Sequence, residues 1–284
     1  MTEAEVLLGD LVTDAGRILS AGRIPEPRRE ALRLWSDLVE ASPADAILGR
    51  RTPVSADQVA AFLSAVERRA GGEPLAYVSG WAGFRRLTLQ VDRRVLIPRP
   101  ETEGLVDLVL ARAPRGIAAD VCTGSGCLAL GLADEGQYDR VLGVDLSRDA
   151  LAVASGNARR TGLAVNLLRG DLTSTLAAAS IDVLVANPPY IATAEYAALD
   201  VSVRDWEPAM ALESGADGLE ATRRLLDDGR RVVSAGGLIA LEIDASRADA
   251  TAQTAHALGW QQVMIHHDLF GRERYLLAQR SEIP

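Results

Sequence analysis

The sequence predicts an α/β protein in which a small helical bundle precedes a mostly parallel, seven-stranded sheet with one reversed strand. Residues 1–74 carry apolar side chains at helical spacing. From residue 116 onward, strand-like and helix-like segments alternate, which is typical of a parallel sheet covered by helices on both faces. The last two strand-like segments, 263–268 and 274–280, are joined by only a few residues, so we expect that pair to be antiparallel.

The first part of the chain is expected to form three helices, over residues 4–19, 27–41 and 55–70, with Ser55 as the N-cap of the third. The spacing then changes over residues 75–92, where aromatic residues are interspersed with glycines and Leu87, Leu89 and Val91 occupy alternate positions. This pattern predicts a β-hairpin within a linker over residues 75–97. The helical domain therefore covers residues 1–74, and the α/β domain covers residues 98–284.

The α/β domain opens with Pro98 and Pro100, which delay a helix until Glu101 or Thr102. Ser147 is expected to cap the helix of residues 147–162, and Gly162 to end it. We expect the strands at 116–124, 140–145, 164–171, 181–189, 238–244, 263–268 and 274–280. We expect the helices that follow them at 125–136, 147–162, 218–237 and 246–259.

The composition limits the kind of protein. The chain has 284 residues and a net charge of −9, and no apolar run is long enough to span a bilayer. The acidic start, "MTEAEVLLGD", lacks the layout of a secretory signal, so we expect a cytoplasmic protein. Two cysteines and three histidines do not predict a disulfide framework or a metal site. The negative charge disfavours a nucleic-acid substrate, and we expect a monomer that does not bind membranes.

Ligands of an open parallel sheet bind beyond the carboxyl ends of its strands, and three of these ends suit a nucleoside. Gly124 and Gly126 follow the first strand, where they let a ligand approach the backbone or simply form a tight turn. Asp145 ends the second strand about 20 residues later, at the place of a ribose-binding carboxylate. Asp145 could instead be the N-cap of the next helix, but Ser147 fits that role better. Asp171 ends the third strand, either near an adenine amino group or as a turn residue.

Ribose and adenine are common to NAD and S-adenosylmethionine, and "GSGCLA" also satisfies a relaxed dinucleotide pattern. The fourth strand end, "VLVANPPYIA", distinguishes the two cofactors. Pro188 and Pro189 have no N–H, so the carbonyl of Pro188 is free to accept a hydrogen bond alongside the side-chain oxygen of Asn187. These two acceptors suit the two hydrogens of a planar –NH₂, and Tyr190 offers that group a flat face.

A nitrogen whose lone pair is conjugated is a weak nucleophile, and acceptors on its hydrogens direct that lone pair toward an electrophile such as a sulfonium methyl group. A nicotinamide enzyme would instead need a proton donor or acceptor at this place. The pattern therefore predicts methyl transfer to an amide, or to the exocyclic amine of adenine or cytosine. A proline-rich turn is the purely structural interpretation.

Five segments together resemble the HemK-like release factor glutamine methyltransferases, a protein-(glutamine-N5) methyltransferase family, over almost the whole chain. They are "IPRPETE", "DVCTGSGCLAL", "VANPPYI", "WEPAMALESGADGL" and "HHDLFGRERYLLAQR". The resemblance implies the Rossmann-like sheet of class I methyltransferases. It also implies S-adenosyl-L-methionine as the cofactor and, as substrate, the glutamine of the Gly-Gly-Gln motif in class I peptide chain release factors. The helical domain would dock that protein substrate of translation termination.

The resemblance also assigns roles to residues. Asn187, Pro188 and Tyr190 would be catalytic, and Asn187 would contact both the cofactor and the substrate. Arg99, Glu101 and Thr102 either line the site or simply start a helix. The ribose of the cofactor would bind Asp145, and its adenine would lie between Asp171 and Leu172. The methionine end of the cofactor would contact Cys122, Thr123, Gly124, Ser125 and Gly126. The substrate amide would be held by Asn187, Pro188, Pro189 and Tyr190.

Two departures from the family pattern bear on the cofactor. Cys122 replaces a usual glycine and would be strained at positive φ, and Leu172 replaces an aromatic residue found in some members. Two other functions stay open from the residues alone. One is adenine-N6 or cytosine-N4 methylation of nucleic acid, which would need a basic groove. The other is a non-catalytic adaptor with a decayed fold, against which the intact Asn-Pro-Pro-Tyr segment argues.

Overall fold

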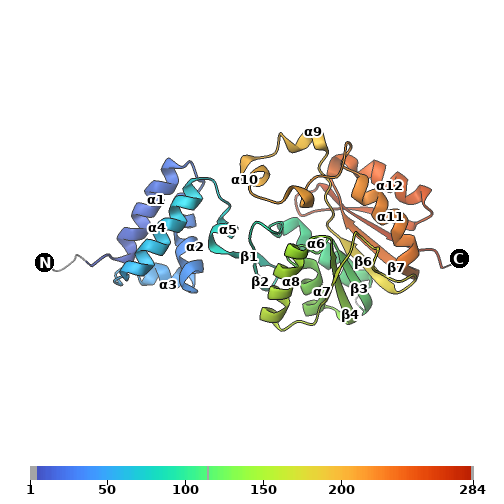
Figure 1. The fold of residues 1–284 in the computed structure, drawn as a ribbon, viewed down its shortest axis with the longest axis horizontal. Coiled ribbons are helices and arrows are strands. Elements are labelled where there is room, and N and C mark those ends of the chain that lie inside the picture. The colour runs from blue at the N-terminus through green and yellow to red at the C-terminus, as the bar shows by residue number, and fades with distance from the viewer. Residues whose placement is uncertain (1–4, 114, 283–284) are drawn as a thin grey trace. The chain divides into compact units, whose positions relative to one another are not determined.

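The computed structural model describes residues 5–113 and 115–282. The chain forms two compact units (Figure 1). A helical unit comprises Met1–Trp81 and Asp200–Trp206, and an α/β unit comprises Ala82–Leu199 and Glu207–Pro284. Among the described residues, no helix has both the length and the apolar character needed to cross a membrane.

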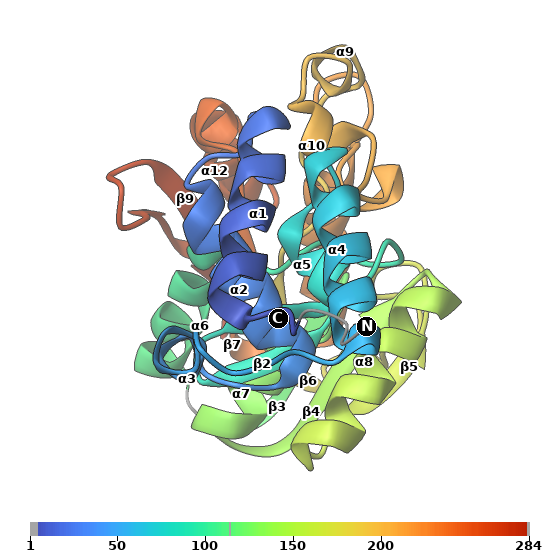
Figure 2. The same ribbon diagram turned by 90° about the vertical axis from the view of Figure 1, so that its left-hand side faces the viewer.

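In the helical unit, α1, α2 and α4 pack side by side as a bundle (Figures 1 and 2). Leu19, Leu34 and Phe62 are fully buried between them, and Trp35 meets Phe62 edge to face with ring centroids 5.4 Å apart. Ser55 caps α4 through a capping box with Gln58, as its sequence position predicts. The helices of this unit are α1 (Leu8–Ala21), α2 (Pro27–Val39), α3 (Pro43–Leu48), α4 (Ala56–Ala70), α5 (Leu75–Ser79) and α10 (Val201–Arg204).

The segment predicted as a hairpin begins with a helix instead. Residues 75–79 form α5, and only β1 (Trp81–Phe84) and β2 (Leu87–Gln90) make the hairpin. The carbonyl of Pro74 accepts the N–H groups of Tyr77 and Val78, whose side chains are both buried. Burial of one side of a single helical turn therefore outweighs the strand preference of these residues. The turn ends at Gly80, at φ +82°.

The α/β unit contains the seven-stranded sheet that the sequence predicts, in the order β5-β4-β3-β6-β7-β9-β8. β9 runs antiparallel to both of its neighbours, and the other paired strands are parallel. The single reversed strand is therefore confirmed. The strands are β3 (Arg115–Val121), β4 (Gln137–Asp145), β5 (Asn166–Arg169), β6 (Ile181–Ala186), β7 (Val233–Glu242), β8 (Gln261–His267) and β9 (Glu273–Gln279).

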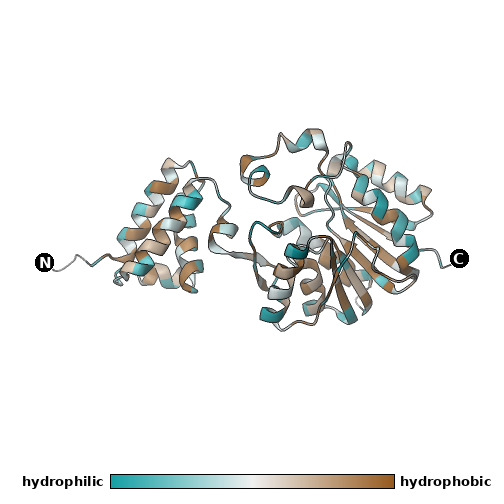
Figure 3. Cartoon of the chain, in the orientation of Figure 1, coloured by the Kyte–Doolittle hydropathy of each residue, from teal (hydrophilic) through white to brown (hydrophobic). Residues whose placement is uncertain are grey.

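Helices cover both faces of this sheet, as consecutive residues of β6 show. Leu184 packs in one apolar cluster with Leu225 of α11, whereas Val183 and Val185 pack in another with Leu105 of α6. Most residues of the strands are accordingly hydrophobic (Figure 3). The longer helices of the unit are α6 (Pro100–Arg112), α7 (Cys127–Glu135), α8 (Arg148–Thr161), α11 (Glu220–Val232) and α12 (Ala248–Ala257).

The helix predicted over residues 218–237 is shorter than expected, because β7 already begins at Val233. Gly236 (φ +73°) and Gly237 follow, and glycines are poor helix formers. At Gly237 a side chain would lie 2.9 Å from the carbonyl oxygen of Asp182, so the two strands approach closely there. Five further short helices among the described residues were not predicted: α3 and α10 of the helical unit, and α9 (Thr193–Tyr196), η1 (Ala209–Ala211) and η2 (Ala245–Arg247) of the α/β unit.

Candidate active site

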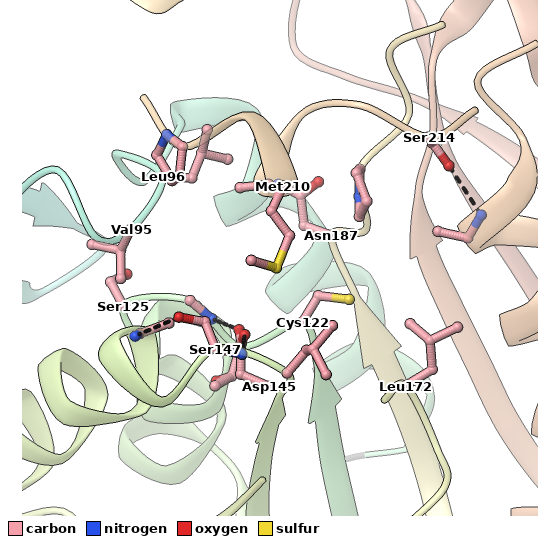
Figure 4. A pocket seen from close by; sticks show the side chains of 18 of the residues that line it. Val95, Leu96, Cys122, Ser125, Asp145, Ser147, Leu172, Asn187, Met210 and Ser214 are labelled. Carbon is pink, nitrogen blue, oxygen red and sulfur yellow. Dashed lines mark hydrogen bonds between the residues drawn. The ribbon is translucent and has the colours of Figure 1, made fainter. Parts of the chain in front are cut away.

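A cavity of about 310 Å³ opens in the α/β unit, where β3, β4, β5 and β6 end side by side (Figure 4). Nine of the residues predicted for the site line it. Gly126, Pro188 and Tyr190 are adjacent to this lining and are not part of it. The predicted residues that line the cavity are Cys122, Thr123, Gly124, Ser125, Asp145, Asp171, Leu172, Asn187 and Pro189.

The loop after β3 brings backbone to the cavity wall. Gly124 and Gly126 have φ of +54° and +83°, the left-handed region that glycine occupies without strain. A side chain on Gly124 would meet nothing closer than 4.0 Å, so there is room for one. Glycine is favoured at this position because of its positive φ. Cys122 has φ +64° and carries a side chain, so the strain expected of a cysteine at this position is present.

Asp145 ends β4 and is fixed by backbone hydrogen bonds. Its Oδ2 accepts from the N–H of Gly124 (2.9 Å), and its Oδ1 accepts from the N–H of Ser147 (2.9 Å). The N-cap of α8 is Ser147, whose Oγ accepts from the N–H of Ala150 (3.2 Å). Burial raises the pKa of Asp145, and these backbone donors oppose the rise. Since each carboxylate oxygen has a second lone pair, Asp145 can still accept two ligand hydroxyls.

Asp120, in β3, does not line the cavity, but it holds Thr123, which does, and this role was not predicted. It is fully buried, and its Oδ2 accepts from the hydroxyl of Thr123 (2.6 Å) and the N–H of Ala129 (3.0 Å). Its Oδ1 is buried and has no hydrogen-bond partner among the described residues. Burial raises the pKa of this carboxyl to about 7. An acidic residue inside the apolar run "IAADV" was the available signal.

The third strand end brings Asp171 and Leu172 to the cavity. The carboxylate of Asp171 accepts a hydrogen bond from Arg224 of α11 (2.7 Å), and Arg224 also lines the cavity. Leu172 is 8% exposed and packs against the apolar core below. Arg224 was not predicted as a site residue, because it comes from a helix 53 positions after Asp171.

The fourth strand end connects Asn187 to residues beyond its own loop. Asn187 donates from Nδ2 to the hydroxyl of Thr102 (3.1 Å), and Thr102 donates to Oε2 of Glu242 (2.7 Å). The hydroxyl of Tyr190 donates to Oε1 of the same carboxylate (3.3 Å). Glu242 ends β7 and is buried, and its role was not predicted.

The rim of the cavity joins two segments that are far apart in the sequence. Glu207 is buried and accepts hydrogen bonds from the N–H of Ile97 (3.1 Å) and from the guanidinium of Arg99. Arg99 and Thr102 line the cavity, whereas Glu101 does not. The side chain of Met210, just beyond Glu207, points into the cavity (Figure 4).

Comparison with known proteins places the chain in a family. Residues 10–80 match the model of the PrmC N-terminal domain, and residues 102–204 match the methyltransferase small domain. The release factor glutamine methyltransferase of Moorella thermoacetica is 40% identical, over 95% of this chain and 97% of that protein. The enzyme of the same name from Caulobacter vibrioides is 36% identical, over 94% of each chain. The chain belongs to the release factor glutamine methyltransferase family.

The solved structure of a methyltransferase from Pyrococcus furiosus shares the fold of this family member. It covers 80% of this chain and 100% of its own, with a TM-score of 0.51 and 16% sequence identity. The α/β unit thus has the fold of that methyltransferase. The relatives, which match nearly the whole chain, confirm the family resemblance of the sequence.

The cofactor of this release factor glutamine methyltransferase family member is S-adenosyl-L-methionine, and the cavity fits it. Leu128, Leu146 and Leu172 give the cavity apolar walls of the kind a purine needs. Asp145 supplies a carboxylate for ribose hydroxyls, and Gly124 lets a ligand approach the backbone. Bound there, the cofactor supplies an electrophilic sulfonium methyl group.

Proposed function

We propose that this protein transfers a methyl group from S-adenosyl-L-methionine to the side-chain amide nitrogen (N5) of a glutamine. The substrate is the glutamine of the Gly-Gly-Gln motif in class I peptide chain release factors. The observation that carries the proposal is the position of Asn187. It lines the same cavity as the glycine loop and Asp145, and its Nδ2 is already bound to Thr102. Its Oδ1 is therefore the atom available to a substrate N–H.

Asn187 and Pro188 provide two acceptors for one substrate amide. The Oδ1 of Asn187 accepts one amide hydrogen and the carbonyl of Pro188 accepts the other, while Tyr190 offers a flat face to the amide plane. With both hydrogens held, the nitrogen lone pair points toward the methyl group. The two acceptors also stabilise the positive charge that develops on nitrogen in the transition state. The nitrogen loses its proton during or after the transfer, so the chemistry requires no strong general base.

The cofactor is proposed to lie along the strand ends. Cys122, Thr123, Gly124, Ser125 and Gly126 would contact its methionine end. Its ribose would bind Asp145, and Asp171 with Leu172 would border its adenine.

The proposed protein substrate follows from the names of the relatives, which cover nearly the whole chain. We propose that the helical unit helps to dock the release factor and that the protein works as a cytoplasmic monomer. Methylation of adenine or cytosine in nucleic acid uses similar acceptor geometry. The net charge of −9 and the relatives' names do not favour it.

The test is transfer of a labelled methyl group to a release factor. The wild-type substrate should be labelled, and a substrate whose Gly-Gly-Gln glutamine is replaced by alanine should not. Label that persists in the replaced substrate, or that enters DNA or RNA instead, would refute the proposal.

A further inference from the structure

The side-chain amide of an asparagine can be turned in two ways that differ only by exchanging its oxygen and its NH₂ group. Only one of them suits the proposed reaction, because the substrate amide presents two N–H donors. With Oδ1 toward the substrate, Asn187 accepts a hydrogen bond. With Nδ2 toward the substrate, donor faces donor and the interaction is lost. Some feature of the protein must therefore fix the orientation of this amide.

The hydroxyl of Thr102 identifies that feature, because a hydroxyl has a single proton. Thr102 is 1% exposed, and its Oγ1 lies 2.7 Å from Oε2 of Glu242 and 3.1 Å from Asn187. An ionised carboxylate only accepts hydrogen bonds, so Thr102 donates its proton to Glu242. It can then only accept from Asn187. The atom of Asn187 next to Thr102 is therefore the NH₂ nitrogen, and Oδ1 is turned away from it.

We propose that Thr102 and Glu242 are positioning residues that hold the amide of Asn187 with its oxygen directed at the substrate. The proposal rests on the function proposed above and names the residues that determine the polarity of its acceptor. Neither residue acts on the substrate itself. They act through Asn187, and Glu242 also accepts a hydrogen bond from the hydroxyl of Tyr190 (3.3 Å).

The surroundings of Glu242 bear on its ionisation. Burial raises its pKa, while the hydroxyls of Thr102 and Tyr190 and the charge of Arg274 lower it, and Glu101 raises it. A protonated Glu242 could donate to Thr102, whose own proton would then turn toward Asn187. The amide would reverse, and its NH₂ group would meet the substrate. The charge on Glu242 thus sets the direction of both hydrogen bonds of Thr102, the one to Glu242 and the one to Asn187.

The test uses Thr102→Val, which keeps the shape of the side chain and removes the hydroxyl. With a release factor as substrate, kcat should fall by about 100-fold, the lower end of the range of about 100- to 1,000-fold seen when an oriented transition-state hydrogen bond is lost. The Kd of S-adenosylmethionine should stay within about threefold, because Asp145 and the glycine loop are unchanged. Thr102→Ser keeps the hydroxyl and should recover kcat to within about fivefold of wild type.

Thr251→Val is the matched control. Thr251 is also 1% exposed, and its hydroxyl bonds the carbonyl of Arg247 near the start of α12, away from the cavity. Its loss should leave kcat unchanged. If Thr102→Val keeps wild-type kcat, or if Thr102→Ser falls as far as Thr102→Val, the proposal is wrong.

A second measurement does not depend on activity. In ¹⁵N–¹H spectra, the side-chain NH₂ signals of Asn187 can be assigned by their loss in Asn187→Asp. They should shift and exchange faster with solvent in Thr102→Val, and should not change in Thr251→Val. An unchanged signal in Thr102→Val would overturn the positioning role. A wild-type enzyme that fails to label the release factor would instead refute the proposed function, while this spectrum would still decide the positioning role.

Discussion

Asp120 makes the stability of the α/β unit depend on pH, and Asp120→Asn should remove that dependence. The carboxyl is fully buried, and one of its oxygens has no partner among the described residues. An asparagine in the same place keeps an oxygen for the hydroxyl of Thr123 and the N–H of Ala129. The substitution therefore replaces a titrating group with a neutral one while the donors around it stay satisfied.

The size of the effect follows from the shift in pKa. Burial raises the pKa of Asp120 from 3.8 to about 7. A group whose pKa is raised on folding contributes stability that is complete below pH about 4 and is lost as the pH rises through about 7. A shift of this size corresponds to about 4 kcal/mol of stability. Roughly 2–3 kcal/mol of this falls between pH 5 and pH 8.

The assay is urea unfolding of wild type and Asp120→Asn at pH 5 and pH 8. The free-energy difference between the two proteins isolates Asp120, because all other groups titrate in both. The variant should gain about 2–3 kcal/mol relative to wild type as the pH rises from 5 to 8. Asp227→Asn, whose side chain is exposed on α11, is the control and should show no such gain. A difference for Asp120→Asn that stays flat with pH, or falls, would refute the reasoning.

Three further predictions concern the site. Asn187→Ala should abolish turnover while the Kd of S-adenosylmethionine, measured by calorimetry, rises only modestly; near-normal turnover would remove Asn187 from the proposed chemistry. Glu207→Gln should lower the free energy of unfolding by about 1–3 kcal/mol, because it weakens a buried charge-assisted pair with Arg99. Asp134→Asn weakens an ion pair with Arg86, whose side chain is 66% exposed, and should lower the free energy of unfolding by less than about 1 kcal/mol. Equal losses in the Glu207 and Asp134 variants would show that the buried pair adds no more stability than the exposed one. Cys122→Gly should leave stability unchanged or raise it by up to about 1 kcal/mol, since relief of positive φ exceeds the added entropy of the unfolded chain; a clear loss in a thermal melt would show that the cysteine is not strained.

Much of the fold and part of the site were predictable because their signals are local in the sequence. The buried strands are short apolar runs, and each residue proposed for the cofactor follows such a run directly. Parallel strands bring their carboxyl ends to one edge, so Gly124, Asp145, Asp171 and Asn187 line one cavity. The reversed last strand followed from the length of one loop.

The parts that could not be predicted depend on contacts between distant segments. Residues 75–79 carry strand-forming side chains, and only the burial of Tyr77 and Val78 makes that segment a helix. The pairs Arg224–Asp171 and Arg99–Glu207 join residues 53 and 108 positions apart. No local pattern encodes such a pairing, because each partner alone resembles an ordinary surface charge.

The orientation of Asn187 shows most clearly why a motif underdetermines a site. Asn-Pro-Pro-Tyr supplies an amide, but the motif is the same whether the oxygen or the nitrogen of that amide faces the substrate. The choice is made by Thr102, 85 positions away, and by Glu242, 140 positions from Thr102. A single hydroxyl proton, committed to a buried carboxylate, leaves only one arrangement that satisfies every donor. Acceptor chemistry is therefore a property of the folded network, and the segment "IPRPETE" contributes to it through Thr102.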